Sequence, residues 1–293
     1  MRTLPFEAPP PPVTMVMPQT PQLVFTVLWG SVFLLLALYA GYRLVVKRDP
    51  LFAVLLLGGA ICYFAEPMVD VLGLLWHPTI GQWVAVDTFR ACPLWGLFVY
   101  AICFGGLPYF MLVDFRRAGF TARRAWTWIG VFWVVDVLVE IPILGSGLYD
   151  YYGDPPMEVA GLPLYWLFMN IAGPLETAVI LLLAGSYFRG WKTLLVAALP
   201  VSLDVAGSSV VGWPVFSALH AQAGVGVKYL AALVTVGLGV ATLAATISFA
   251  AGRSGGGVRG GRVRGGGVRG GRGDRDGGVR GGEPGGGSRL AEA

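Results

Sequence analysis

Long apolar stretches alternate with short polar ones along most of the chain. Each apolar stretch exceeds the roughly 18 residues that indicate a membrane-spanning helix. The polar interruptions are short and rich in Arg, Lys, Gly or Pro, as expected where helices end and turns begin. The pattern predicts an all-α polytopic membrane protein, a seven-transmembrane-helix bundle, with spans at residues 22–46, 50–76, 91–113, 125–147, 164–187, 191–213 and 228–250.

The two ends of the chain do not share this pattern. Residues 1–21 are rich in Pro, and residues 251–293 consist largely of Gly and Arg. A segment with so few apolar residues cannot bury a core, so we expect the second one to be disordered. The sequence thus predicts a Pro-rich N-terminal tail (1–21), a seven-helix transmembrane domain (22–250) and a disordered basic tail (251–293).

Composition agrees with a membrane protein and argues against a soluble domain. Of the 293 residues, 55% are hydrophobic and only 13% are charged, and the mean hydropathy is +0.67. A soluble domain carries about 25% charged residues. The three cysteines, Cys62, Cys92 and Cys103, lack metal-ligand spacing. We therefore expect them to be small, buried apolar side chains.

The distribution of basic residues predicts the orientation in the cell membrane. Short cytoplasmic loops carry an excess of Lys and Arg. Arg2, Arg90 and Lys228 are the only basic residues on one side of the predicted bundle. The other side has nine: Arg43, Lys47, Arg48, Arg116, Arg117, Arg123, Arg124, Arg189 and Lys192. The side with nine is therefore predicted to be cytoplasmic, which puts the N-terminus outside and the C-terminus in the cytoplasm.

The basic tail suggests a partner as well as a location. Gly- and Arg-rich repeats can bind RNA, but no Phe or Tyr interleaves the arginines here. The tail also directly follows a membrane span, where basic residues are attracted to anionic headgroups. We expect it to contact anionic lipid, and we expect no specific nucleic-acid partner.

Six carboxylic acids interrupt the predicted spans. A charged acid costs several kcal/mol if it faces lipid, so all six should face the interior of the bundle. No span contains a Lys or Arg in its interior, so burial and mutual repulsion should keep some of these acids neutral. They are our candidate catalytic residues: Glu66, Asp70, Asp136, Glu140, Glu176 and Asp204.

The spacing of these acids suggests a shared pocket. Glu66 and Asp70, and likewise Asp136 and Glu140, are four residues apart and so share a helix face. Three of the glutamates lie within two residues of Pro67, Pro142 or Pro174, and proline kinks a membrane helix and frees a backbone carbonyl. We expect the acids to line a pocket where helices splay apart, together with the candidate substrate-binding aromatics Tyr63, Phe64, Trp133, Trp166 and Phe168.

A neutral acid beside an ionised one suits proton transfer to a lipophilic substrate. The acid can protonate an alkene or an epoxide, aromatic faces can stabilise the resulting cation, and the second carboxylate can accept the final proton. The sequence contains no CxxC, HExxH or P-loop motif. We therefore expect acid–base chemistry that uses no cofactor and no metal.

Seven spans with short loops and an intramembrane Glu in span two resemble the integral-membrane terpene cyclases of fungal meroterpenoid and actinobacterial indole-terpenoid pathways. The resemblance implies an isoprenoid substrate and matches Glu66 to the family's acid. The family's Asp lies near the last span, which has no acid here, and Asp204 is the nearest substitute. The stretch "AEPMVDVLG…HPTIGQW" also resembles an actinobacterial group of seven-span proteins.

Two other functions remain open at this stage. Acids at mid-membrane and broken helices also suit a proton-coupled transporter of a small hydrophobic or cationic solute. Seven spans with an external N-terminus suit a receptor. A retinal protein would need a Lys inside the last span, and Lys228 lies at its edge.

Overall fold

The computed structural model of the protein describes residues 8–259, with side chains as far as residue 253. The predicted basic tail therefore lies mostly outside the described residues. Its first part is helical, because the last helix continues to Arg259. The predicted N-terminal tail is described from residue 8 onward.

The described residues are mostly helical. The α-helices are α1 (Gln19–Val45), α2 (Leu51–Cys62), α3 (Glu66–Gly73), α4 (Leu94–Tyr100), α5 (Leu107–Ala118), α6 (Ala122–Gly145), α7 (Trp166–Ala184), α8 (Ala198–His220) and α9 (Val225–Arg259). Two 3₁₀ segments, η1 (Tyr63–Ala65) and η3 (Gly190–Ala197), and one π-helical segment, η2 (Ala101–Gly106), join some of them. The strands are β1 (Leu75–Trp76), β2 (Val84–Asp87), β3 (Ala91–Pro93), β4 (Asp150–Tyr151), β5 (Glu158–Val159) and β6 (Leu162–Pro163).

The prediction of seven long apolar helical segments is confirmed. Within the described residues, seven segments are long and apolar enough to cross a membrane by length and composition. Each overlaps one predicted span. They are Gln19–Val46, Leu51–Gly73, Leu94–Ala118, Ala122–Gly145, Trp166–Ala184, Gly190–His220 and Val225–Arg253.

The second and third of these segments are interrupted in the middle. In the second, α2 ends at Cys62, a 3₁₀ turn follows, and α3 begins at Glu66 with Pro67 in its first turn. Proline lacks an N–H and is tolerated at this position of a helix. In the third segment, the π-helical residues of η2 separate α4 from α5, which carries Pro108 in its first turn.

The two interrupted segments pack closely against each other through glycines. A Cβ atom on Gly105 of η2 would lie 2.4 Å from the carbonyl oxygen of Leu55 on α2. A Cβ atom on Gly59 of α2 would lie 2.6 Å from the backbone nitrogen of Gly105. Glycine therefore permits the close approach of α2 and η2, as small residues do between membrane helices.

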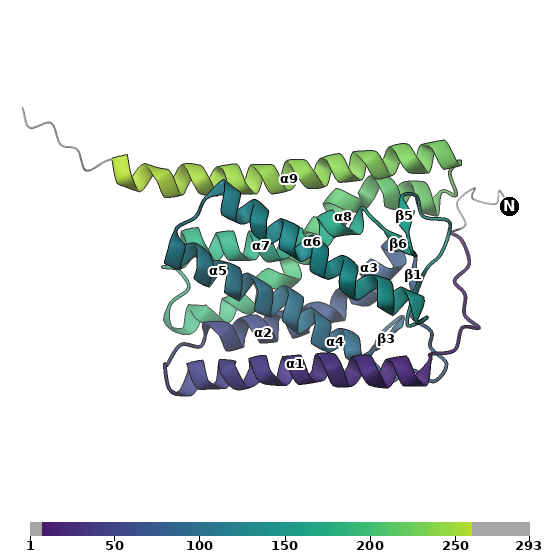
Figure 1. Cartoon of the computed structure of the whole chain (residues 1–293), viewed down its shortest axis with the longest axis horizontal. Coiled ribbons are helices and arrows are strands. Elements are labelled where there is room, and N and C mark those ends of the chain that lie inside the picture. Colours follow the sequence, from purple (N-terminus) through teal and green to yellow (C-terminus); the bar gives the residue numbers. More distant parts are fainter. Residues whose placement is uncertain (1–7, 260–293) are drawn as a thin grey trace, which may run out of the picture. The chain divides into compact units, whose positions relative to one another are not determined.

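Short antiparallel ladders join the connections at one end of the bundle. Leu75 of β1 pairs with Tyr151 of β4, β2 pairs with β3, and β5 pairs with β6. Figure 1 shows the labelled strands at the same end of the helices. We call residues 74–93 and 146–165 together the cap. The sequence indicated aromatic loops here and gave no sign of pairing between them.

The segment before α1 also packs on the cap. Met17 is fully buried, and its N–H donates to the carbonyl of Ile80 at 2.9 Å. Val16 forms a parallel bridge with the same residue. The end of the predicted N-terminal tail is therefore fixed against the first half of the cap.

Candidate functional site

A cavity of about 190 Å³ lies inside the bundle, next to the cap. Six of the seven apolar segments contribute to its wall, and α9 does not. Five of the six predicted acids line it, so we call it the acid cavity. Its other lining residues include Tyr63, His77, Trp95, Tyr100, Tyr149, Tyr151, Trp166, Asn170 and Ser208.

Glu66 lies at the break between η1 and α3. Its side chain is buried, and the hydroxyl of Tyr100 on α4 donates a hydrogen bond to Glu66 Oε2. Electrostatic interactions also link Glu66 to Asp70, Asp204 and Glu140. The interrupted helix thus places this acid opposite the end of α4, within reach of three other carboxylates.

Asp204 enters the cavity from α8. Its side chain is 3% exposed, and Cys62 Sγ donates to Asp204 Oδ2 at 3.4 Å. A Cβ atom on Gly173 of α7 would lie 3.1 Å from Asp204 Cα. The absence of a side chain at residue 173 lets α7 and α8 approach closely at the level of this acid.

Asp136 and Glu140 lie one turn apart on α6, and both face the acid cavity. Asn170 Nδ2 donates to Asp136 Oδ2 at 3.3 Å, and the Tyr149 hydroxyl donates to Glu140 Oε2. Burial raises the pKa of Tyr149 well above its usual value, and the nearby Glu140 adds to this effect. The Tyr149 hydroxyl therefore stays protonated and remains a donor.

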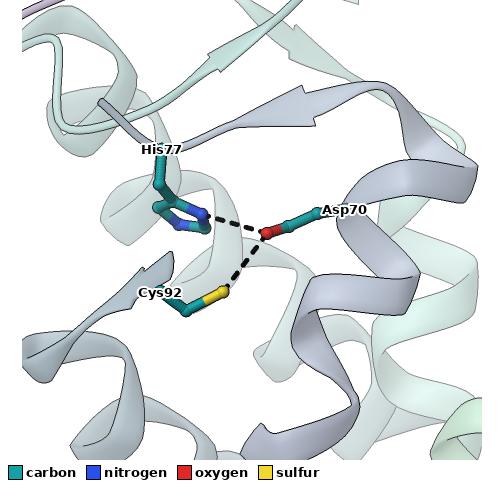
Figure 2. A group of neighbouring side chains, drawn as sticks. All are labelled: Asp70, His77 and Cys92. Atoms are coloured by element: carbon teal, nitrogen blue, oxygen red, sulfur yellow. Dashed lines mark hydrogen bonds and ion pairs between the residues drawn. The ribbon is translucent and has the colours of Figure 1, made fainter. Parts of the chain in front are cut away.

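Asp70 forms the centre of a different group. His77 Nδ1 lies 3.2 Å from Asp70 Oδ2, and Cys92 Sγ lies 3.5 Å from the same oxygen. Figure 2 shows the two side chains converging on Asp70, His77 from the chain after β1 and Cys92 from β3. Burial raises the pKa of the Cys92 thiol, and the charges of Asp70 and Glu66 raise it further.

Aromatic rings form the part of the cavity wall nearest the cap. Trp95 and Tyr149 are stacked with their ring centroids 6.2 Å apart, and the His77 ring lies 5.5 Å from that of Tyr149. Tyr149 also packs edge-on against Tyr151, which contacts Trp166. The acids therefore share the cavity with several π faces.

Cations do not neutralise these acids. No Lys or Arg is among the residues that line the acid cavity. Arg90 donates to the Leu75 carbonyl and the Tyr152 hydroxyl, and Lys228 donates to the carbonyls of Gly153 and Asp154. Both basic side chains bind oxygens of the cap instead.

Four of the predicted site residues do not line the cavity. Glu176 borders a separate groove between α7 and α9, with Thr246 and Arg253. Phe64 is 61% exposed. Trp133 donates through Nε1 to the Leu167 carbonyl and packs on Phe168. Of the five predicted aromatics, the structure brings only Tyr63 and Trp166 to the acids.

Sequence reasoning missed the polar partners of the acids. Cys92 was expected to be a small apolar side chain and His77 was not among the candidate residues, yet both contact Asp70. Tyr100 and Tyr149 were not considered as donors. The sequence carries only a weak signal for these four residues. Each is a polar side chain near the end of an apolar stretch, and no local pattern indicates which acid it contacts.

This arrangement is suited to proton transfer in an apolar space. It combines carboxylates that have different hydrogen-bond donors with aromatic faces and no lining cation. Comparisons with models of protein families, with curated proteins and with solved structures find no match to this chain. The function must therefore be argued from the acid cavity itself.

Proposed function

We propose that this protein is an integral-membrane acid–base enzyme acting on a lipophilic isoprenoid, by proton-initiated cyclisation, isomerisation or hydration. The acid cavity carries the proposal. It gathers Glu66, Asp70, Asp136, Glu140 and Asp204 beside aromatic rings and away from cations. An oily substrate needs an apolar cavity, and proton chemistry needs acids in unequal environments.

The surface of the bundle supports a location in the cell membrane. Large apolar side chains are exposed along the outer helices, among them Leu35 on α1, Leu138 on α6 and Leu230 on α9. Soluble proteins rarely expose such continuous apolar surface. The proposed partners are therefore membrane lipid and a hydrophobic small molecule. Contact of the basic tail with anionic lipid stays a prediction, because that tail is mostly outside the described residues.

In the proposed reaction, Glu66 donates a proton to an alkene or epoxide of the substrate. In an alkene, the π electron pair forms the new C–H bond to the proton. In an epoxide, the proton binds the oxygen, which keeps the electron pair of the breaking C–O bond. A carbocation remains on carbon in either case. The aromatic rings of Tyr63, Trp95 and Trp166 would stabilise that cation. A second carboxylate, Asp204 or Glu140, accepts a proton from the cation as the final double bond forms, so the net change is isomerisation or cyclisation.

The interrupted helices favour one alternative, a proton-coupled carrier of a small hydrophobic or cationic solute. Glu66 directly follows η1, Tyr100 directly precedes η2, and the Tyr100 hydroxyl donates to Glu66. Transporters bind their substrates at discontinuous helices of this kind. The carrier and the enzyme make opposite predictions about covalent change in the substrate.

Replacing the proposed proton donor tests the enzyme directly. We expect Glu66→Gln to lower turnover by at least roughly 100-fold, because general acid catalysis contributes factors of that size. The protein would be expressed in a host that makes prenylated quinols, linear polyprenyl epoxides and carotenoids. Untargeted mass spectrometry of lipid extracts would then compare wild type with the variant.

The matched comparison is Glu176→Gln, which makes the same chemical change outside the acid cavity and should keep the product. An unchanged mass relative to the substrate would indicate cyclisation or isomerisation, and a gain of one water would indicate hydration. Equal product formation by wild type and Glu66→Gln would refute the assignment. No new product from well-expressed wild type would favour the carrier, which flux assays in proteoliposomes would then test.

A further inference from the structure

Asp70, His77 and Cys92 bring three different metal-binding atoms together. The carboxylate oxygen, imidazole nitrogen and thiol sulfur all lie within 4.8 Å of one another. Figure 2 shows Asp70 and His77 on one stretch of backbone and Cys92 on another, with His77 and Cys92 both pointing toward Asp70. Among the described residues, no other group of His, Cys, Asp and Glu meets this spacing.

Two of the three separations match those between ligands of one tetrahedral ion, and the third is within 4.8 Å. With zinc–nitrogen and zinc–oxygen bonds near 2.05 Å, tetrahedral geometry separates N and O by about 3.3 Å. With a zinc–sulfur bond near 2.3 Å, it separates S and O by about 3.6 Å. The observed distances are 3.2 Å for His77 Nδ1 to Asp70 Oδ2 and 3.5 Å for Cys92 Sγ to the same oxygen.

Hydrogen bonding alone leaves this group incompletely satisfied. The side chains of His77 and Asp70 are each 3% exposed, and Cys92 is fully buried. Both contacts use Asp70 Oδ2, while Asp70 Oδ1 is buried with no hydrogen-bond partner. An unpaired carboxylate oxygen in such a place is unfavourable, because the oxygen has lost its water without gaining a partner, and a bound cation would offset that loss.

The order of contacts among the three side chains also differs from that in a Cys–His nucleophile. In such a site the imidazole contacts the sulfur and the carboxylate orients the imidazole. Here the carboxylate is central and contacts both the imidazole and the thiol. A shared cation explains three converging ligands better than a proton relay does.

We propose that Asp70, His77 and Cys92 bind a divalent transition-metal ion, with zinc the best fit to this N, O and S donor set. Three protein ligands leave a fourth position for water or for a polar group of a substrate. Asp70 and His77 line the acid cavity, so the ion would form part of its wall. The site does not depend on the proposed isoprenoid chemistry, in which no step requires the metal.

The ion would also connect the helices to the cap. Asp70 belongs to α3, His77 follows β1, and Cys92 lies in β3. Asp70 and His77 lie seven residues apart on one stretch of chain, Cys92 lies on another, and among the described strands β2 pairs only with β3. A metal bond between them would hold the β2–β3 hairpin and the end of β1 over the acid cavity.

Metal content of the full-length protein tests the proposal without any activity assay. Protein purified in detergent would be stripped with a chelator, incubated with Zn²⁺ or Co²⁺ and desalted. We expect wild type to retain about one ion per chain by elemental analysis. Its Co²⁺ form should show the intense visible bands of a tetrahedral site and a thiolate-to-cobalt charge-transfer band.

The ligand variants are Asp70→Asn, His77→Ala and Cys92→Ser. Each should lower metal affinity by more than roughly 100-fold, since loss of outer partners alone costs 10- to 100-fold. Cys92→Ser should also remove the charge-transfer band. Cys62→Ser is the matched control, because Cys62 is a buried thiol that contacts a carboxylate, Asp204, without a histidine; it should keep both the ion and the band.

Each variant would be checked by size-exclusion chromatography and circular dichroism. X-ray absorption of the wild-type zinc form adds a measurement that needs no variant, and it should find one sulfur and otherwise N or O ligands. Folded wild type that retains no ion would overturn the proposal. So would retention that is equal in the three ligand variants, or a zinc spectrum without sulfur.

Discussion

At the scale of single residues, the five acids of the cavity differ because their hydrogen-bond donors differ. A phenol, an amide and a thiol stabilise a carboxylate to different degrees. Unequal acids are what a site needs when one group gives a proton and another accepts it. The donors are Tyr100 for Glu66, Asn170 for Asp136, Tyr149 for Glu140 and Cys62 for Asp204, while Asp70 contacts the His77 ring and the Cys92 thiol.

The donor at Glu66 gives a prediction at this scale. Tyr100→Phe removes the hydroxyl that stabilises the charge formed when Glu66 releases its proton. A hydrogen bond to a charged group contributes about 1.5–3 kcal/mol, so kcat should fall roughly 10- to 100-fold. KM should change little, and both constants would be measured with purified protein in liposomes.

Tyr109→Phe is the control for this substitution. Tyr109 is buried against Phe52, away from the acid cavity. It should keep the wild-type kcat. An unaffected kcat in Tyr100→Phe would show that this hydroxyl does not assist the proton donor.

At the scale of elements, the position of the site depends on two broken helices that meet through glycine. The break at η1 turns Glu66 into the cavity, and η2 carries the chain from Tyr100 on α4 to α5. Pro67 predicted the first interruption from the sequence. The π-helical segment had no comparable signal, because its residues are ordinary apolar ones and glycines.

The contact between α2 and η2 can be tested by adding one methyl group. In Gly105→Ala the new Cβ would lie 2.4 Å from the Leu55 carbonyl oxygen, a backbone atom that cannot move alone. We expect a loss of about 1–3 kcal/mol in the free energy of unfolding, as for other overpacked cores. The thermal unfolding midpoint in detergent would report it.

Gly130→Ala on α6 is the matched change, because a Cβ atom there has nothing within 4 Å. Alanine favours a helix over glycine by about 1 kcal/mol. The midpoint of Gly130→Ala should therefore equal or exceed that of wild type. A Gly105→Ala midpoint at the wild-type value would show that the two segments do not pack this tightly.

At the scale of the whole molecule, an odd number of membrane-crossing segments, seven among the described residues, would place the two termini on opposite sides of the proposed membrane. The proposed orientation puts the basic connections in the cytoplasm and the cap outside. Arg123 and Arg124 lie in the first turn of α6, next to the connection from α5, and Asp114 of α5 pairs with Arg124 at 3.5 Å. The acid cavity and the proposed metal site would then open toward the outer half of the bilayer.

Protease accessibility of tags at the N- and C-termini checks this orientation. We expect an N-terminal tag to be cut by protease added to intact cells or spheroplasts, and a C-terminal tag to be cut only after lysis. The physical reason is the cost of moving the Arg-rich connections across the bilayer. A C-terminal tag that is cut from outside would invert the proposed topology.

The sequence by itself determined the seven apolar helical segments, although not the strands of the cap or the π-helical segment. Hydrophobic periodicity and span length are local properties, and they predicted seven apolar helices and the interruption at Pro67. Residues four apart on a helix must face the same way, so the pairing of Glu66 with Asp70, and of Asp136 with Glu140, also followed from spacing alone.

Only the tertiary structure decided which acids share a cavity and which side chains contact them. Asp204 joins Glu66 because α2, α7 and α8 pack closely, while Glu176 on α7 turns toward α9. His77 and Cys92 reach Asp70 because the cap folds back over α3. Such contacts depend on the path of loops and on packing between distant segments, which no local pattern encodes.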